Sequence, residues 1–225
     1  MSSRTALKEK RLYPVLFMLI LSIILTSILA LFFELSKERV AAYQELSFRR
    51  DLIGLFQKQI SGIDNSNLAM MDIKQINSIY ESAVTELHIA PKQEIIYYQV
   101  KDGNQLIGFC YPFSMSGLWG TISLLAAVDV DFSTIMGIRI TNQNETPGLG
   151  GRISEDWFQQ QFAGHRFRAG NEFLTWELIP EKSVPQKEAI RQITGATISS
   201  RSVTDGLLMR LKQIYQLQVP AGSDK

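Results

Sequence analysis

The sequence predicts an α+β fold, with an antiparallel sheet and flanking helices preceded by one N-terminal transmembrane helix. An uncharged apolar run lies near the start of the chain, β-branched and aromatic runs fill its middle, and an amphipathic run lies near its end. The strand-like runs lack the regular strand–helix alternation of a parallel sheet, so an antiparallel sheet is expected. The length of 225 residues is enough for one sizeable domain in addition to the apolar run.

The apolar run covers residues 12–33 and reads LYPVLFMLILSIILTSILALFF, with no charged side chain. A helix of this length crosses the hydrocarbon core of a bilayer. A cleaved signal peptide would have a shorter apolar stretch and would end in small residues. This run ends in Leu31, Phe32 and Phe33. The sequence therefore predicts a retained, single-pass anchor in contact with membrane lipid.

The charges beside this run predict its orientation. The tail of residues 1–11 carries Arg4, Lys8, Lys10 and Arg11 against one acid, Glu9. Because positively charged flanks stay on the cytoplasmic side, the tail is expected in the cytoplasm. The main domain then lies on the outer face of a bacterial inner membrane, in the periplasm of a Gram-negative cell.

Residues 34–90 are predicted to form a helical linker region. Apolar residues at helical intervals predict helices over 34–60 and about 70–88, and the polar stretch 61–67 reads as their connector.

The remaining domain is predicted over residues 91–220. Two β-branched and aromatic runs flank Asp102 and Gly103, which is a hairpin signal. Ser154 is a candidate N-cap for a short helix, with acidic residues in its first turn. The expected elements are strands over 94–100, 105–113, 121–130, 134–143 and 172–179, and helices over 154–164 and about 200–218.

Composition argues against several classes of function. A net charge of +1 gives no bulk attraction to nucleic acid. The single cysteine, Cys110, cannot form an intramolecular disulfide or a multi-cysteine metal site within the chain. His88 and His165 are far apart and lack ligand spacing. No catalytic residue and no metal are therefore expected.

Three short segments carry unusual residue choices. They are SGLWG at 116–120, NETPGLGG at 144–151 and TGAT at 194–197, the last just before the final helix. Each segment also has a purely structural interpretation. The first would be a turn that places Trp119 in the core, the second a flexible connector, and the third a helix start capped by Ser199 or Ser200. The functional reading is that a phosphate near Thr197 would meet the free N–H groups of a helix start.

Together these segments resemble a family of membrane-anchored flavin subunits. TGAT resembles the family's (S/T)-G-A-T attachment motif, NETPGLGG its E-T-P-G-L-G loop, and GLW its tryptophan-bearing segment. The family includes the C subunit of the Na+-translocating NADH:quinone reductase and the G subunit of the Rnf-type ferredoxin:NAD+ complex. The GLW segment, the doubled glycine and WFQQQF look closer to the C subunit. The chain is shorter than is usual for the C subunit, which keeps the G subunit as the alternative.

The resemblance implies FMN held covalently by a phosphoester to Thr197, attached by a flavin transferase. The family normally has an Asp six residues before the modified Thr, where this chain has Arg191. The remaining cofactor-binding residues that the resemblance implies are Thr194, Gly195, Ala196, Ile198, Ser199, Glu145, Thr146, Gly148, Leu149, Gly150, Leu118 and Trp119.

The resemblance further implies an electron-transfer subunit of an ion-translocating NADH:quinone oxidoreductase, without independent activity. It would relay electrons between redox centres of neighbouring membrane subunits, ending in ubiquinone reduction and Na+ export. An alternative from another class is an anchored, non-redox module that has lost the flavin, which Arg191 favours.

Overall fold

The computed structural model describes residues 3–63, 65–89, 95–186 and 188–218. Internal contacts divide the chain into two compact units between Glu45 and Leu46. The elements are α1 Ser3–Leu55, α2 Asn65–Met70, α3 Ile73–Ala83, β1 Val84–Ile89, β2 Ile95–Asp102, β3 Gln105–Ser116, β4 Thr121–Asp129, β5 Ile135–Asn142, the 3-10 helix η1 Gly150–Ser154, α4 Asp156–Gln160, β6 Arg168–Ala169, β7 Glu172–Phe173, β8 Glu177–Ile179, β9 Ala189–Arg191 and α5 Thr197–Gln218.

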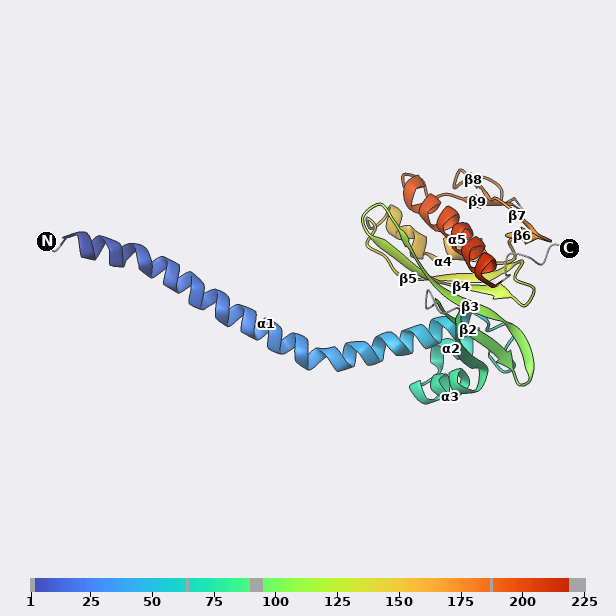
Figure 1. The fold of residues 1–225 in the computed structure, drawn as a ribbon, viewed down its shortest axis with the longest axis horizontal. Coiled ribbons are helices and arrows are strands. Elements are labelled where there is room, and N and C mark those ends of the chain that lie inside the picture. Colours follow the sequence, from blue (N-terminus) through green and yellow to red (C-terminus); the bar gives the residue numbers. More distant parts are fainter. Residues whose placement is uncertain (1–2, 64, 90–94, 187, 219–225) are drawn as a thin grey trace. The chain divides into compact units, whose positions relative to one another are not determined.

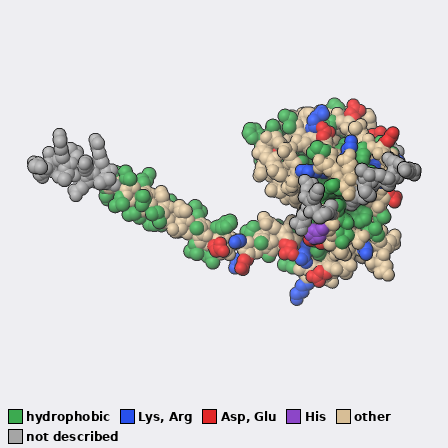
Figure 2. Space-filling view, in the orientation of Figure 1, with side chains coloured by type: hydrophobic (Ala, Val, Ile, Leu, Met, Phe, Trp, Pro, Cys, Tyr) green, Lys and Arg blue, Asp and Glu red, His purple; other side chains and the backbone are tan. Residues whose placement is uncertain are grey.

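The first unit is the N-terminal part of α1. The helix contains a stretch that is long and apolar enough to cross a membrane, and none of that stretch is buried inside the protein. Its large apolar side chains between Tyr13 and Phe33 are exposed, and Figure 2 shows hydrophobic side chains gathered along this part of the helix. A long apolar helix of this kind fits a single-pass membrane anchor.

The second unit is built on a five-stranded antiparallel sheet in the order β1-β2-β3-β4-β5. Helix α5 covers one face of the sheet, and the end of α1 with α2 and α3 covers the other (Figure 1). Side chains alternate along the interior strand β4, so that Leu124 packs towards α5 and Leu125 towards α1. Both faces are therefore buried, and the predicted α+β architecture with an antiparallel sheet is confirmed.

The hairpin predicted at Asp102 and Gly103 is the β2–β3 connection, with Gly103 at a φ of 58°. The strands predicted over 121–130 and 134–143 are β4 and β5. The registers Ser116↔Thr121 and Ser123↔Asn142 bring the β3–β4 connection and the end of β5 to one end of the sheet. Two of the three unusual segments follow at this end.

Four expectations about local structure are wrong. The helix predicted to residue 88 ends at Ala83, because Val84–Ile89 pair with β2 as β1. Ser154 is not an N-cap, since η1 runs through it and Glu155 precedes α4. The strand predicted over 172–179 is broken into β7 and β8. The final helix begins at Thr197 and not near residue 200.

Truncating Leu125 should destabilise the domain far more than truncating an exposed leucine. Leu125 is 1% exposed at the centre of the sheet, so Leu125→Ala should lower the free energy of unfolding by about 2–5 kcal/mol. Leu217 is 45% exposed on α5, so Leu217→Ala should change it by no more than about 0.5 kcal/mol. Urea unfolding of the detergent-solubilised protein measures both, and equal midpoints would contradict the assigned core.

Candidate functional site

The three segments singled out in the sequence meet at one place. The β3–β4 connection holds Leu118 and Trp119, the loop after β5 holds residues 143–149, and the first turn of α5 begins at Thr197. The loop also lies against the TGAT turn, since a methyl group on Gly195 would lie 3.2 Å from Leu149 Cδ2. Every residue implied by the resemblance lies on one of these segments or at the start of η1.

A buried carboxylate joins the three segments. Glu145 is 5% exposed. Its Oε1 accepts the backbone N–H of Trp119 at 3.0 Å, and its Oε2 accepts the hydroxyl of Ser199 at 2.5 Å. The backbone N–H of Glu145 donates to Gln143 Oε1 at 2.6 Å. Because a buried carboxylate without donors is costly, these bonds are what make its burial tolerable.

The hydroxyl cluster around α5 divides into occupied and exposed groups. Ser200 Oγ accepts the N–H of Ile193 and donates to the carbonyl of Ala196, both at 3.0 Å. Thr204 Oγ1 donates to the Ser200 carbonyl, and Ser199 donates to Glu145. The side chains of Thr194 and Thr197 are exposed.

The start of α5 leaves backbone donors available. Ser200 N–H donates to the Ala196 carbonyl at 3.0 Å, which closes the first turn. Among the described residues, no hydrogen bond is recorded from the N–H groups of Thr197, Ile198 or Ser199. Such N–H groups together with the helix dipole favour an anion at this end of the helix.

The three segments that meet at this site carry large apolar side chains that the protein leaves exposed. Leu118 is 52% exposed, Trp119 70%, Leu149 44% and Ile198 57%. Thr146 is also exposed, and its carbonyl accepts the N–H groups of Leu149 and Gly151. Gly148, with a φ of 76°, sits inside this turn. The purely structural interpretation that places Trp119 in the core is therefore wrong, and the site combines exposed apolar surface with free N–H donors.

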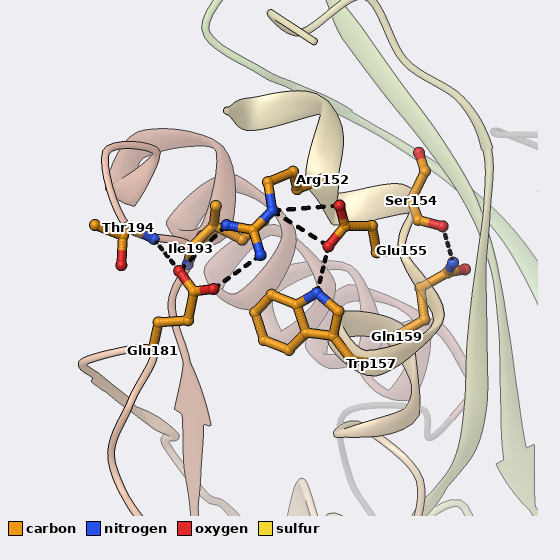
Figure 3. Close-up of polar contacts among 9 residues, drawn as sticks. Arg152, Ser154, Glu155, Trp157, Gln159, Glu181, Ile193 and Thr194 are labelled. Atoms are coloured by element: carbon orange, nitrogen blue, oxygen red, sulfur yellow. Dashed lines mark hydrogen bonds and ion pairs between the residues drawn. The ribbon is translucent and has the colours of Figure 1, made fainter. Parts of the chain in front are cut away.

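A network of charges that the sequence did not suggest supports the TGAT turn (Figure 3). Arg152 Nη2 donates to Glu181 Oε1 at 2.8 Å, and Arg152 Nε donates to Glu155 at 3.2 Å. Glu181 Oε2 accepts the backbone N–H of Thr194 at 2.7 Å. Together the Arg152 and Thr194 bonds lower the pKa of Glu181 to about 2. The hydrogen bonds of Arg152 to Glu181 and to Glu155 raise the pKa of Arg152.

Arg191, which stands where the family has an Asp, is tied into the domain. Its backbone N–H and its Nε both donate to Gln161 Oε1, at 2.9 and 3.1 Å. Its guanidinium carbon lies 5.6 Å from the ring centroid of Trp157, and that of Arg152 lies 5.5 Å from a ring of the same residue. Trp157 Nε1 in turn donates to Glu155.

The remaining reactive side chains form no second centre. Cys110 is buried, and burial raises the pKa of its thiol. His165 has its pKa lowered chiefly by burial. Within the described ranges, no group of three or more His, Cys, Asp or Glu residues is placed to hold a metal ion.

Comparison with known proteins identifies the domain that carries this site. Residues 117–211 match the family model of the FMN-binding domain. The G subunit of the proton-translocating ferredoxin:NAD(+) oxidoreductase complex of Clostridium ljungdahlii is 36% identical over 118 residues, covering 52% of this chain and 59% of the relative. The C subunit of the Na(+)-translocating NADH-quinone reductase of Vibrio vulnificus is 29% identical over 109 residues, covering 48% and 43%. The crystal structure of the C subunit of the corresponding reductase from Parabacteroides distasonis aligns with a TM-score of 0.60 at 20% identity, covering 81% of this chain and 98% of that chain.

These matches confirm the resemblance that the three segments predicted. Residues 117–211 match the FMN-binding domain, and the relatives described above are C and G subunits of ion-translocating oxidoreductase complexes. The chain spans roughly half the length of these curated relatives, 59% and 43%. The likeness to the solved Parabacteroides distasonis structure concerns the fold alone.

Replacing Glu181 should cost stability in a way that depends on pH. The folded-state pKa of Glu181 is about 2, below the ordinary 4.5, so its ionised form stabilises the fold. The loss of Tm in Glu181→Gln should be fully present above about pH 4.5 and should vanish as the pH falls through about 2. Thermal unfolding across this range measures it, with Glu177→Gln on β8 as the control. A constant loss at every pH would contradict the role of the ionised carboxylate.

Proposed function

We propose that this chain carries FMN joined through its phosphate to Thr197 Oγ1 and serves as an electron-transfer subunit of an ion-translocating oxidoreductase complex. The observation that carries the proposal is that Thr197 is exposed at the start of α5, on one of three joined segments that also carry four exposed apolar side chains. These residues fit a phosphate-bearing flavin, because they offer free N–H groups for the phosphate and apolar surface for a flat ring.

The occupation of the neighbouring hydroxyls supports Thr197 as the attachment point. The hydroxyl of Ser199 donates a hydrogen bond to Glu145 Oε2, and the hydroxyl of Ser200 donates one to the Ala196 carbonyl. Both residues are buried. Thr194 is exposed, but it precedes the helix, and its N–H is held by Glu181. Thr197 alone combines an exposed hydroxyl with the first turn of α5.

The other residues of the site then have separate tasks. The N–H groups of residues 197–199 bind phosphate oxygens. Leu118, Trp119, Leu149 and Ile198 exclude water from the faces of the ring. Thr146 offers an exposed hydroxyl to the ribityl chain or to the edge of the ring. Gly195, with a φ of 78°, and buried Ala196 keep the turn before Thr197 narrow. The bound flavin itself supplies the redox chemistry.

The type of complex has two candidate assignments. The GLW segment, the doubled glycine and WFQQQF favour the C subunit of a Na+-translocating NADH:quinone reductase, which would relay electrons towards ubiquinone. The greater identity to the Clostridium ljungdahlii relative, 36% against 29%, favours the G subunit of an Rnf-type complex. Co-purification distinguishes them, because the neighbouring membrane subunits of the two complexes differ. A module without flavin remains the alternative from another class, favoured by Arg191.

The remaining elements of the proposal concern partners and place in the cell. A flavin transferase attaches the cofactor. Residues 12–33 anchor the chain in the lipid of a bacterial inner membrane, and the FMN-binding domain predicted over 91–220 lies in the periplasm. The basic tail supports this orientation. The segment predicted as a linker, 34–90, also contributes to that domain, because the end of α1, α2, α3 and β1 pack on the same sheet.

Thr197→Ala should abolish covalent flavin, because no other exposed hydroxyl lies on the first turn of α5. The chain is produced together with a flavin transferase, denatured and separated by electrophoresis. Wild type and Thr85→Ala, which changes an exposed threonine on β1, should fluoresce in the gel, whereas Thr197→Ala should be dark. Mass mapping should find the added FMN on the peptide that contains Thr197. Fluorescence of denatured Thr197→Ala would contradict the attachment point.

The orientation predicts which face of the membrane exposes the domain. Proteinase K added to spheroplasts should digest the chain beyond Phe33, whereas inverted membrane vesicles should protect it until detergent is added. Protection in spheroplasts and digestion in inverted vesicles would reverse the assigned topology.

A further inference from the structure

Both carboxylate oxygens of Glu145 are engaged within the protein, and this points to a task other than contact with a cofactor. It is 5% exposed, and each oxygen already accepts a donor from a different segment. We propose that Glu145 is a positioning residue: its carboxylate fixes the Trp119 loop against the first turn of α5 before the flavin is attached. The inference rests on the proposed attachment of FMN to Thr197.

The glycines of two segments make room for this carboxylate. A methyl group on Gly117 would lie 2.4 Å from Glu145 Oε1, and one on Gly150 would lie 2.7 Å from Oε2. The methyl group on Gly150 would also lie 2.5 Å from Ser199 Oγ. Real Cβ atoms do not approach other atoms so closely, so Glu145 contributes to the need for glycine at both positions. At Gly117 the Gly120 carbonyl oxygen, 2.9 Å from such a methyl group, contributes as well. One glycine of each segment, Gly117 of SGLWG and Gly150 of GLGG, is thereby explained without any contact to a ligand.

The two hydrogen bonds of the Glu145 carboxylate hold the two segments that the proposed flavin would contact, the first turn of α5 and the Trp119 loop. Ser199 lies two positions after Thr197, so the bond to its hydroxyl fixes the first turn of α5. The bond to the Trp119 N–H fixes the backbone from which the exposed side chains of Leu118 and Trp119 project. One carboxylate thus sets the position of the apolar wall relative to the attachment hydroxyl. Its negative charge is also favoured at the start of a helix.

A positioning role and a direct chemical role predict different behaviour of Glu145→Gln. The Gln carbonyl oxygen can accept the Trp119 N–H while its amide donates to Ser199 Oγ, so the two links survive without the charge. Glu145→Ala removes both links. A residue that held or moved a proton at the reacting hydroxyl would fail equally in both variants, because neither side chain is a base.

The test compares the full chain in detergent as wild type, Glu145→Gln, Glu145→Ala, Ser199→Ala and the double variant. Glu172→Gln on β7 is the matched control, since Glu172 is exposed and makes no contact with the site. Amide hydrogen exchange of peptides covering 117–120 and 144–151 is measured without flavin. The rate of flavin attachment and the visible circular dichroism of the attached flavin are measured next. The far-ultraviolet circular dichroism spectrum verifies that each variant is folded.

In Glu145→Ala, we expect loss of amide protection over 117–120, altered visible dichroism and attachment slowed by about tenfold, which corresponds to about 1.4 kcal/mol. Glu145→Gln should stay within about threefold of wild type, since it keeps both links at reduced strength. The effect of Glu145→Ala on the attachment rate should be smaller in the Ser199→Ala background than in wild type, because the two residues share one hydrogen bond.

Two results would overturn the proposal. One is a folded Glu145→Ala with wild-type exchange, attachment and dichroism. The other is Glu145→Gln as impaired in attachment as Glu145→Ala while the Trp119 amide stays protected. If Glu145→Ala does not fold, Ser199→Ala decides: unchanged protection and unchanged dichroism also overturn the proposal. A wild-type chain without flavin would instead refute the attachment to Thr197, while the exchange data would still test the links made by Glu145.

Discussion

The arrangement of the site depends on one buried charge, the carboxylate of Glu145. Removing a carboxylate from water is costly unless hydrogen-bond donors replace the water, and here the donors come from the Trp119 backbone and the Ser199 hydroxyl. Those donors lie 26 and 54 residues away along the chain. Satisfying one charge therefore brings three loops together, and it contributes to the need for glycine at Gly117 and Gly150.

The sheet supplies the rigid frame on which these loops are held. Because β3, β4 and β5 are antiparallel neighbours, the Trp119 loop and the Glu145 loop leave the sheet at the same end. The N-terminus of α5 reaches that end while its apolar residues pack on the sheet, with Val203, Leu207 and Leu211 fully buried. The pair formed by Arg152 and Glu181 adds a second link, from η1 to the TGAT turn. The site is therefore made of loops whose ends are all fixed by the core.

Local signals in the sequence were sufficient for the central part of the fold. The hairpin at Gly103 and the strands β4 and β5 follow from alternation and turn residues. These local signals do not show which strands pair. Val84–Ile89 continue a helical pattern in the sequence, yet they pair with β2 as an edge strand. The three site segments could be recognised from their residue types. The hydrogen bond between Glu181 and the backbone of Thr194 could not, because the two residues are 13 positions apart and Glu181 belongs to no recognisable motif. The hydroxyl cluster was recognised, but only packing decides which hydroxyls are already occupied.

The beginning of α5 at Thr197 has a consequence for how a cofactor attached there would move. Its attachment atom belongs to a helix whose buried face is part of the core, so that end of the cofactor would share the small fluctuations of the interior. The ring, by contrast, would rest on side chains that are about half exposed or more. The proposed attachment atom would therefore be held by the core, whereas the side chains that would contact the ring are open to solvent.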